Sequence, residues 1–162
     1  MVKILFSGVC RAQYNEMIGL KGPDRFLPHL LGHEAAGFVV DAGPGITRVK
    51  AGDYVALSWI KGAGLEAGAT KYRCRGETIN AGGVTTFSEH AVVSENRVTR
   101  ISRRIAPDVA SIIGCAVVTG AGIVNNTLQA RPGTTLAVFG VGGIGLNVIM
   151  AAKIKGCAKI IA

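Results

Sequence analysis

A glycine pattern near the end of the sequence is the feature that most constrains the fold. Residues 135–145 read TLAVFGVGGIG, in which three glycines fit G-x-G-x-x-G. The pattern follows an apolar run typical of a buried strand, opens a helical segment, and is followed by a second apolar run, AKIIA. Strand, helix and strand in this order predict a βαβ unit with parallel strands.

Each glycine of this pattern has a physical role in a dinucleotide site. Gly140 permits a tight turn from strand to helix, Gly142 lets the backbone approach a pyrophosphate, and Gly145 lets the helix pack closely on the strand. The N–H groups at the helix N-terminus then favour phosphate. A glycine-rich turn without a ligand is the alternative interpretation. The predicted cofactor-binding residues of this segment are Gly140, Val141, Gly142, Gly143, Ile144 and Gly145.

Short strand-like segments fill residues 1–107, which we predict to be a compact β domain. A helix is expected over CRAQYNEMIG, because its apolar residues have helical spacing and it ends at a glycine. The polar, glycine-rich residues 61–83 are expected to be an irregular loop. Strands are expected over residues 2–9, over residues 35–43, on both sides of the turn Ala51–Gly52–Asp53, and in the alternating residues 85–102.

The character of the sequence changes at residues 108–162. The segment DVASIIGCAVVTGAGIVNNTL predicts a buried helix with one or two interruptions and with Asp108 as its N-cap. The βαβ unit follows it, with two buried strands. Because two strands leave one face uncovered and an edge open, we expect this second domain to be incomplete.

Composition excludes several other classes of protein. The chain has 162 residues, 49% of them hydrophobic and only 6% aromatic, and a formal charge of +8. The lysines and arginines are scattered, which disfavours nucleic-acid binding. No apolar run reaches the roughly 18–20 residues of a membrane span, and no secretory signal is visible. These features predict a cytoplasmic protein whose four cysteines are thiols or metal ligands.

The segment LLGHEAAGFVV, residues 30–40, places His33 and Glu34 side by side between two apolar runs. A hydrogen-bonded turn histidine is one interpretation and a metal ligand is the other. Zinc prefers Cys and His, and a catalytic zinc has three protein ligands. The spacings of the cysteines and histidines fit no local zinc motif, so the residues alone leave both interpretations open. His29 and His90 are expected to be exposed or hydrogen-bonded histidines.

Four segments together resemble the medium-chain dehydrogenase/reductase family, in particular its zinc-dependent alcohol dehydrogenases. They are GVCRAQYNEMIG, LLGHEAAGFVVDAGPGITRVKAGDYV, GCAVVTGAG and VFGVGGIGLNVIMAAKIKGCAKIIA, and they occur in family order over nearly the whole chain. The resemblance implies a GroES-like β domain over 1–107, lacking its usual N-terminal strands. It also implies the start of a Rossmann domain over 108–162, so the chain would be part of a longer protein.

The resemblance also implies the site residues. The ligands of one catalytic zinc would be Cys10, His33 and Cys115, with Glu34 near the metal and able to join its coordination. Arg11 matches a residue that contacts the cofactor pyrophosphate in some members, and Thr119 matches a position beside the nicotinamide. The implied activity is hydride transfer between an alcohol and NAD or NADP. The complete protein would be a homodimer or homotetramer that acts on a small-molecule alcohol or carbonyl.

The chain departs from the family pattern at three positions. Ala12 stands where many members carry a hydroxyl that starts a proton relay, and Gln13 stands where an Asp is common, in a place suited to support the ligand histidine. Cys74 is the single cysteine in the region where many members hold a structural zinc with four, so we predict no structural zinc. Two further functions therefore stay open: a non-catalytic zinc-binding or interaction module, and a zinc-free reductase of the quinone or enoyl type.

Overall fold

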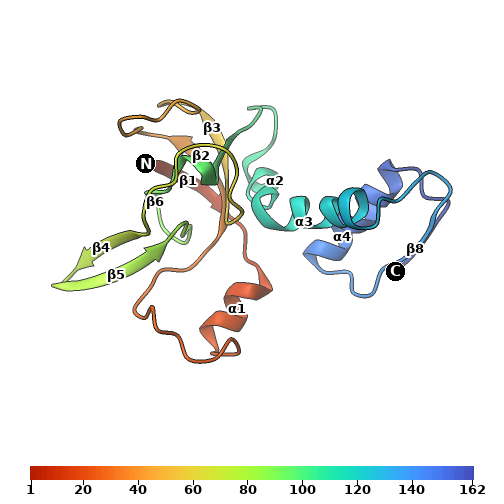
Figure 1. The fold of residues 1–162 in the computed structure, drawn as a ribbon, viewed down its shortest axis with the longest axis horizontal. Helices are drawn as coiled ribbons and strands as arrows, with labels where there is room; N and C mark the ends of the chain where they lie inside the picture. The colour runs from red at the N-terminus through yellow and green to blue at the C-terminus, as the bar shows by residue number, and fades with distance from the viewer. The chain divides into compact units, whose positions relative to one another are not determined.

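The computed structural model describes residues 1–162, which divide into two compact units, Met1–Gly114 and Cys115–Ala162 (Figure 1). The predicted boundary after residue 107 lies within the first unit, and the assignment of the two domains stays a prediction. Each unit is described by itself below. None of the helices combines the length and the apolar character that a bilayer crossing requires.

A five-stranded antiparallel sheet forms the first unit. Its strand order is β6-β1-β2-β3-β7. The strands are β1 Val2–Ser7, β2 Glu34–Val39, β3 Tyr54–Ser58, β6 His90–Ala91 and β7 Val98–Arg100. Aliphatic side chains from these strands form the main core, which contains Val2, Ala35, Val39, Val55, Leu57 and Val98. The predicted β domain is therefore confirmed, with its core on the central strands.

The segment before β3 departs from prediction. The turn at Gly52 forms, with a positive φ of 87° at that glycine, but the residues before it make no strand. Two backbone amides of this segment, those of Thr47 and Arg48, donate instead to the buried Glu95 carboxylate at 2.8 and 2.6 Å. Leu65 N–H donates to the same carboxylate at 2.8 Å. These backbone hydrogen bonds, with Leu65 making the largest contribution, lower the pKa of Glu95.

The prediction of an irregular loop over 61–83 is wrong in its second half. Two strands, β4 Thr70–Cys74 and β5 Glu77–Gly82, pair there as an antiparallel hairpin (Figure 1). Arg75 and Gly76 make its two-residue turn, both with positive φ. The hairpin escapes prediction because most of its side chains are polar and exposed, so it lacks a hydrophobic alternation.

The helical segments before α4 Gly143–Ile154 are all short. They are α1 Arg11–Met17, η1 Glu95–Arg97, α2 Pro107–Ala110, the π-helix η2 Ile113–Val117, α3 Val118–Gly122 and the π-helix η3 Ile123–Thr127. The predicted interruptions of the apolar helix are confirmed. The predicted N-cap is wrong, because the N-cap of α2 lies two residues earlier, at Ala106, and Asp108 lies in the first turn of the helix.

The second unit contains a strand, a helix and a strand. β8 Thr135–Ala137 and β9 Lys159–Ile161 pair in parallel, and α4 Gly143–Ile154 lies between them in sequence. A core of Val124, Val148 and Ala152 packs under the helix, with half-buried Leu136 and Ile160 against it. The other strand residues are exposed, so the expectation that both strands are buried is wrong. One helix covers only one face of a two-stranded sheet. The sequence predicts this uncovered face.

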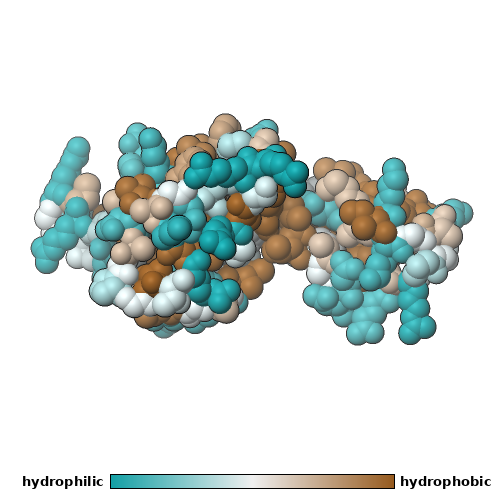
Figure 2. Space-filling view, turned by 90° about the horizontal axis from the view of Figure 1, so that it is seen from above, coloured by the Kyte–Doolittle hydropathy of each residue, from teal (hydrophilic) through white to brown (hydrophobic).

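Exposed apolar residues are a further feature of the second unit. Leu146, Met150 and Ile154 follow one another at a spacing of four along α4 and are 52%, 52% and 88% exposed. Phe139, between β8 and α4, is 99% exposed. Figure 2 shows brown apolar residues among hydrophilic ones on the surface of the chain. The hydrophilic residues do not gather into a single stripe on the face shown.

Candidate metal centre

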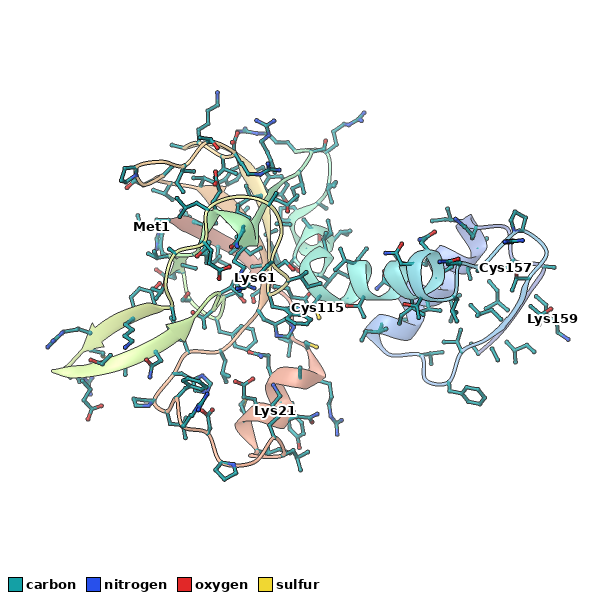
Figure 3. The ribbon with its side chains drawn as sticks, in the orientation of Figure 1. Met1, Lys21, Lys61, Cys115, Cys157 and Lys159 are labelled. Carbon is teal, nitrogen blue, oxygen red and sulfur yellow. The ribbon has the colours of Figure 1, made fainter.

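Three of the predicted site residues come together in the structure. The sulfur atoms of Cys10 and Cys115 and a ring nitrogen of His33 all lie within 4.8 Å of one another. Cys10 and His33 belong to the first unit. Cys115, labelled in Figure 3, is bonded directly to Gly114, the last residue of that unit. All three cluster residues are buried or half-buried.

Cys10 is placed at the start of a helix. It is the N-cap of α1, in an extended conformation, and the helix begins at Arg11. Arg11 is exposed: its Nε donates to Asn15 Oδ1 at 3.2 Å and its guanidinium lies 5.0 Å from the centre of the Tyr14 ring. The helix thus fixes the backbone of Cys10 and leaves the arginine side chain at the surface.

Gln13 connects the helix to the residue before His33. Its side chain is 7% exposed, and its Oε1 accepts a hydrogen bond from Gly32 N–H. Gly32 has a positive φ of 92°, and a Cβ there would lie 2.7 Å from Phe87 N, so only glycine fits. Gln13 therefore holds the backbone directly before His33, and support of the histidine ring by Gln13 stays a prediction.

Glu34 lies at the centre of the backbone arrangement. Its side chain is 2% exposed, and a Cβ on Gly8 would lie 2.7 Å from its carboxyl carbon. Its carbonyl accepts hydrogen bonds from Gly8 N–H at 3.1 Å, Ser7 Oγ at 3.0 Å and Thr86 Oγ1 at 3.2 Å. Glu34 follows His33 directly, so these bonds hold the histidine backbone against the segment that leads to Cys10.

Gly114 brings Cys115 against the sheet. A Cβ on Gly114 would overlap the carbonyl oxygen of Leu57 and would lie 2.9 Å from the carbonyl carbon of that residue. The Gly114 carbonyl accepts a hydrogen bond of 2.6 Å from Ser58 Oγ. Cys115, in η2, is 8% exposed. No sequence pattern indicated the contact with Ser58, because it joins residues 56 positions apart.

The cluster fits a zinc ion. Bonds of about 2.3 Å to sulfur and about 2.0 Å to nitrogen put the ligand atoms of a tetrahedral zinc about 3.5 to 3.8 Å apart. The three ligand atoms of the cluster lie within 4.8 Å of one another, which is compatible with that spacing. Burial lowers the pKa of His33, with a smaller contribution from Lys21, while Glu16 opposes it. A lowered pKa keeps the imidazole neutral at neutral pH, and the neutral form is the one that binds metal.

A second group of potential ligands contains Glu16, Asp24 and His29, also within 4.8 Å of one another. His29 Nδ1 lies 2.8 Å from the Leu30 carbonyl, and Nε2 lies 2.7 Å from the Asp24 carboxylate. Both partners are acceptors, so both ring nitrogens carry protons when both bonds form. The Leu30 carbonyl and then Asp24 raise the pKa of His29. Lys21 Nζ lies 3.0 Å from Glu16, and the group is therefore a hydrogen-bonded ion-pair network, as expected for His29.

The glycine segment has the geometry that its pattern predicts. Gly140 has a φ of 94°, and Gly142 is the N-cap of α4, where no side chain caps the helix. A Cβ on Gly142 would meet nothing within 4 Å, whereas one on Gly145 would overlap the Gly140 carbonyl oxygen. The first turn of α4 contains no acidic residue. The exposed N-terminus of a twelve-residue helix thus presents backbone N–H groups next to open space.

Thr119 lies in α3, four residues after Cys115, and is half-buried. Cys74 is free and exposed at the end of β4, and Cys157 is half-buried against the core of the second unit. His90 is exposed in β6, as expected. The fold and the site together define a class of protein: a β domain with a Cys–His–Cys cluster that could hold a metal ion, followed by a strand–helix–strand unit with a glycine-rich turn.

Comparison with known proteins assigns the family. Residues 1–103 match the family model of the alcohol dehydrogenase GroES-like domain. The alcohol dehydrogenase class-3 of Myxine glutinosa is 33% identical over an alignment that is 186 residues long. The alignment covers 99% of this chain and 49% of the relative. The chain therefore belongs to the alcohol dehydrogenase family of medium-chain dehydrogenases/reductases, as its motifs predict, and its β domain is GroES-like.

Solved structures agree with this assignment. An alcohol dehydrogenase zinc-binding domain protein from Burkholderia ambifaria is 26% identical with a TM-score of 0.77, covering 98% of this chain and 50% of its own. A quinone oxidoreductase from Pseudomonas syringae is also 26% identical, with a TM-score of 0.75 and coverage of 98% and 42%. The chain thus spans about half the length of the relatives that it matches.

Proposed function

We propose that this chain carries the catalytic zinc site of an oxidoreductase that transfers a hydride between an alcohol and NAD or NADP. The observation that supports the proposal most directly is the clustering of Cys10, His33 and Cys115. Two thiolates and one neutral imidazole form a typical donor set for zinc and leave a fourth position for water or substrate. When bound, zinc would act as a Lewis acid on the substrate oxygen.

The chain's own residues would prepare this site in three ways. Burial keeps His33 neutral and ready to bind metal. The Glu34 side chain, buried against Gly8, would adjust the charge near the metal and could join its coordination. Ala12, in α1, has no hydroxyl, so the alcohol proton would leave through another group or through water.

The glycine-rich turn supports the cofactor part of the proposal. The N-terminus of α4 would bind the pyrophosphate of NAD or NADP through the backbone of residues 140–145. Arg11 and Thr119 are proposed as further cofactor contacts, and the strand–helix–strand unit as the beginning of a Rossmann domain. The substrate would be a small alcohol or carbonyl compound, and the complete protein a homodimer or homotetramer.

Metal analysis of the purified chain tests the proposal. We expect one zinc per chain, and we expect Cys10→Ser, His33→Gln and Cys115→Ser each to weaken zinc binding strongly. Cys74→Ser and Cys157→Ser are matched controls, because these cysteines lie outside the cluster, and they should bind zinc like the unaltered chain. Equal zinc loss in the control variants would contradict the assignment of the ligands. We expect no turnover of alcohol by the 162-residue chain alone, since it spans about half the length of the relatives that it matches.

A zinc-free reductase of the quinone type is the second candidate, favoured by the similarity to the Pseudomonas syringae quinone oxidoreductase. Two measurements distinguish this candidate. Such a protein would contain no zinc when purified, and its complete form would retain activity after treatment with a chelator. A non-catalytic zinc module is a third candidate, favoured by the absence of a hydroxyl at Ala12. That module would bind zinc through the same three residues, while its complete form would show no oxidoreductase activity with any alcohol.

A further inference from the structure

One serine hydroxyl connects the strand beside His33 to the peptide that carries Cys115. Ser58 is the last residue of β3, and its Oγ–H donates to the Gly114 carbonyl at 2.6 Å. The same oxygen accepts a hydrogen bond from Ile60 N–H at 3.0 Å. Because the hydroxyl both donates and accepts, its direction is fixed.

The sheet register places this contact next to the histidine ligand. Ser58 pairs directly with Glu34 across β2 and β3, and Glu34 follows His33. Gly114 packs against β2 and β3, the strands that contain Glu34 and Ser58. A Cβ on Gly114 would lie 3.1 Å from Glu34 Cβ. The path from His33 to Cys115 therefore consists of a covalent bond, a strand pair, the Ser58 hydroxyl and a second covalent bond.

We propose that Ser58 is a positioning residue that fixes Cys115 for metal binding. The inference rests on the proposed function, in which Cys115 is a zinc ligand. In this arrangement a single side-chain hydrogen bond determines where the Gly114–Cys115 peptide meets the end of β3. Without the hydroxyl, the Gly114 carbonyl loses its side-chain donor, the peptide moves away from the strand, and the Cys115 sulfur leaves the position set by the other two ligands.

Zinc affinity of three variants tests this role. Ser58→Ala removes the hydroxyl, and Ser58→Thr retains it in a residue that suits a strand. Ser94→Ala is the matched control, because the Ser94 hydroxyl also accepts a backbone N–H and donates to a backbone carbonyl, both of Ala67, outside the cluster. We expect Ser58→Ala to raise the zinc dissociation constant about 10- to 100-fold, as the loss of a supporting partner of a metal ligand does. Ser58→Thr should restore most of the affinity, and Ser94→Ala should leave it unchanged.

Cobalt substitution adds a spectroscopic measurement that a general loss of stability would not change. The charge-transfer absorption of Co²⁺ reports thiolate coordination, so it should weaken in Ser58→Ala and remain in Ser94→Ala at saturating metal. Equal affinities in the unaltered chain and Ser58→Ala would overturn the inference. An equal loss in Ser58→Ala and Ser94→Ala, or no restoration by threonine, would also overturn it.

The metal-free chain separates this inference from the proposed function. Cys115 is 8% exposed, and iodoacetamide labelling followed by mass spectrometry measures how often its thiol becomes accessible. We expect labelling at Cys115 to be about tenfold faster in Ser58→Ala than in the unaltered chain or Ser94→Ala. If the unaltered chain bound no zinc, the proposed function would fail, and the labelling rate alone would decide whether Ser58 fixes Cys115. Unchanged labelling would then refute the role of Ser58.

Discussion

The substitution Gly114→Ala tests the close approach that brings Cys115 to the sheet. A Cβ at this position would overlap the Leu57 carbonyl oxygen and would lie 3.1 Å from Glu34 Cβ. Leu57 is fully buried and Glu34 is 2% exposed, so neither residue can move without disturbing the sheet. Gly114 has no positive φ, and therefore the cost is steric and not conformational.

The magnitude follows from two opposing effects. Overpacking a rigid interior typically costs about 1–3 kcal/mol, and a backbone overlap belongs at the upper end of that range. Replacing glycine by alanine in a helical segment recovers about 0.5–1 kcal/mol. We expect Gly114→Ala to lose about 2 kcal/mol of unfolding free energy, which lowers the midpoint of thermal unfolding by roughly 8 °C. Circular dichroism during heating measures this change.

Gly122→Ala is the matched control for this substitution. Gly122 ends α3 with helical φ and ψ values of −63° and −39°, and the nearest atom to its Cβ position is Asn126 Nδ2 at 3.9 Å. The same chemical change should therefore be neutral or stabilising by about 0.5–1 kcal/mol. Zinc affinity should fall in Gly114→Ala alone. If Gly114→Ala melted like the unaltered chain, or if both variants lost the same stability, the argument from close packing would be refuted.

Three other predictions concern charge and the glycine-rich turn. The raised pKa of His29 means that its protonated form stabilises the fold below about pH 6.5 and that this contribution is lost as the pH rises through the folded pKa. His29→Gln should therefore lower the melting midpoint more at about pH 6 than at about pH 9, and an equal loss at both would contradict the ion-pair assignment. Glu95→Gln should lower the melting midpoint at neutral pH, because one carboxylate oxygen that accepts a backbone N–H becomes an amide donor; an unchanged melting curve would argue against this role. Gly145→Ala should destabilise the second unit more than Gly143→Ala, because only the Gly145 Cβ would overlap a backbone atom. Amide hydrogen exchange in α4 should therefore be faster in Gly145→Ala, and equal exchange rates would contradict this prediction.

The sequence predicted several elements of this fold where hydrophobic residues alternate or repeat, although the strand expected before the Gly52 turn does not form. The strand at residues 2–9 and the helix opened by Gly142 were both found, because one face of each is buried. The hairpin of β4 and β5 was missed, because its residues are mostly polar on both faces. Its Arg75–Gly76 turn between two runs of five and six residues was the available signal.

The candidate site shows why local spacing could not reveal its ligands. Cys10, His33 and Cys115 are far apart in sequence, and no repeat or motif of fixed length joins them. The structure brings them together through backbone contacts that converge on one residue: the Glu34 carbonyl binds Gly8 N–H, two residues before Cys10, and the Glu34 backbone pairs with Ser58. Only the resemblance to a family connected the three residues in advance.

This convergence has a consequence for how the site responds to substitution. Two of the three proposed ligands directly follow a glycine, and each of those glycines is bonded by a side chain of another element: Gly32 by Gln13, and Gly114 by Ser58. The two contacts share no atoms, so their losses should add if each fixes one ligand, and each loss should be measurable alone. Zinc affinity of the double variant Gln13→Met with Ser58→Ala should therefore fall by the product of the two single factors. A double variant no weaker than either single one would mean that both contacts support one rearrangement of the β2 end, and that the ligands are not positioned independently.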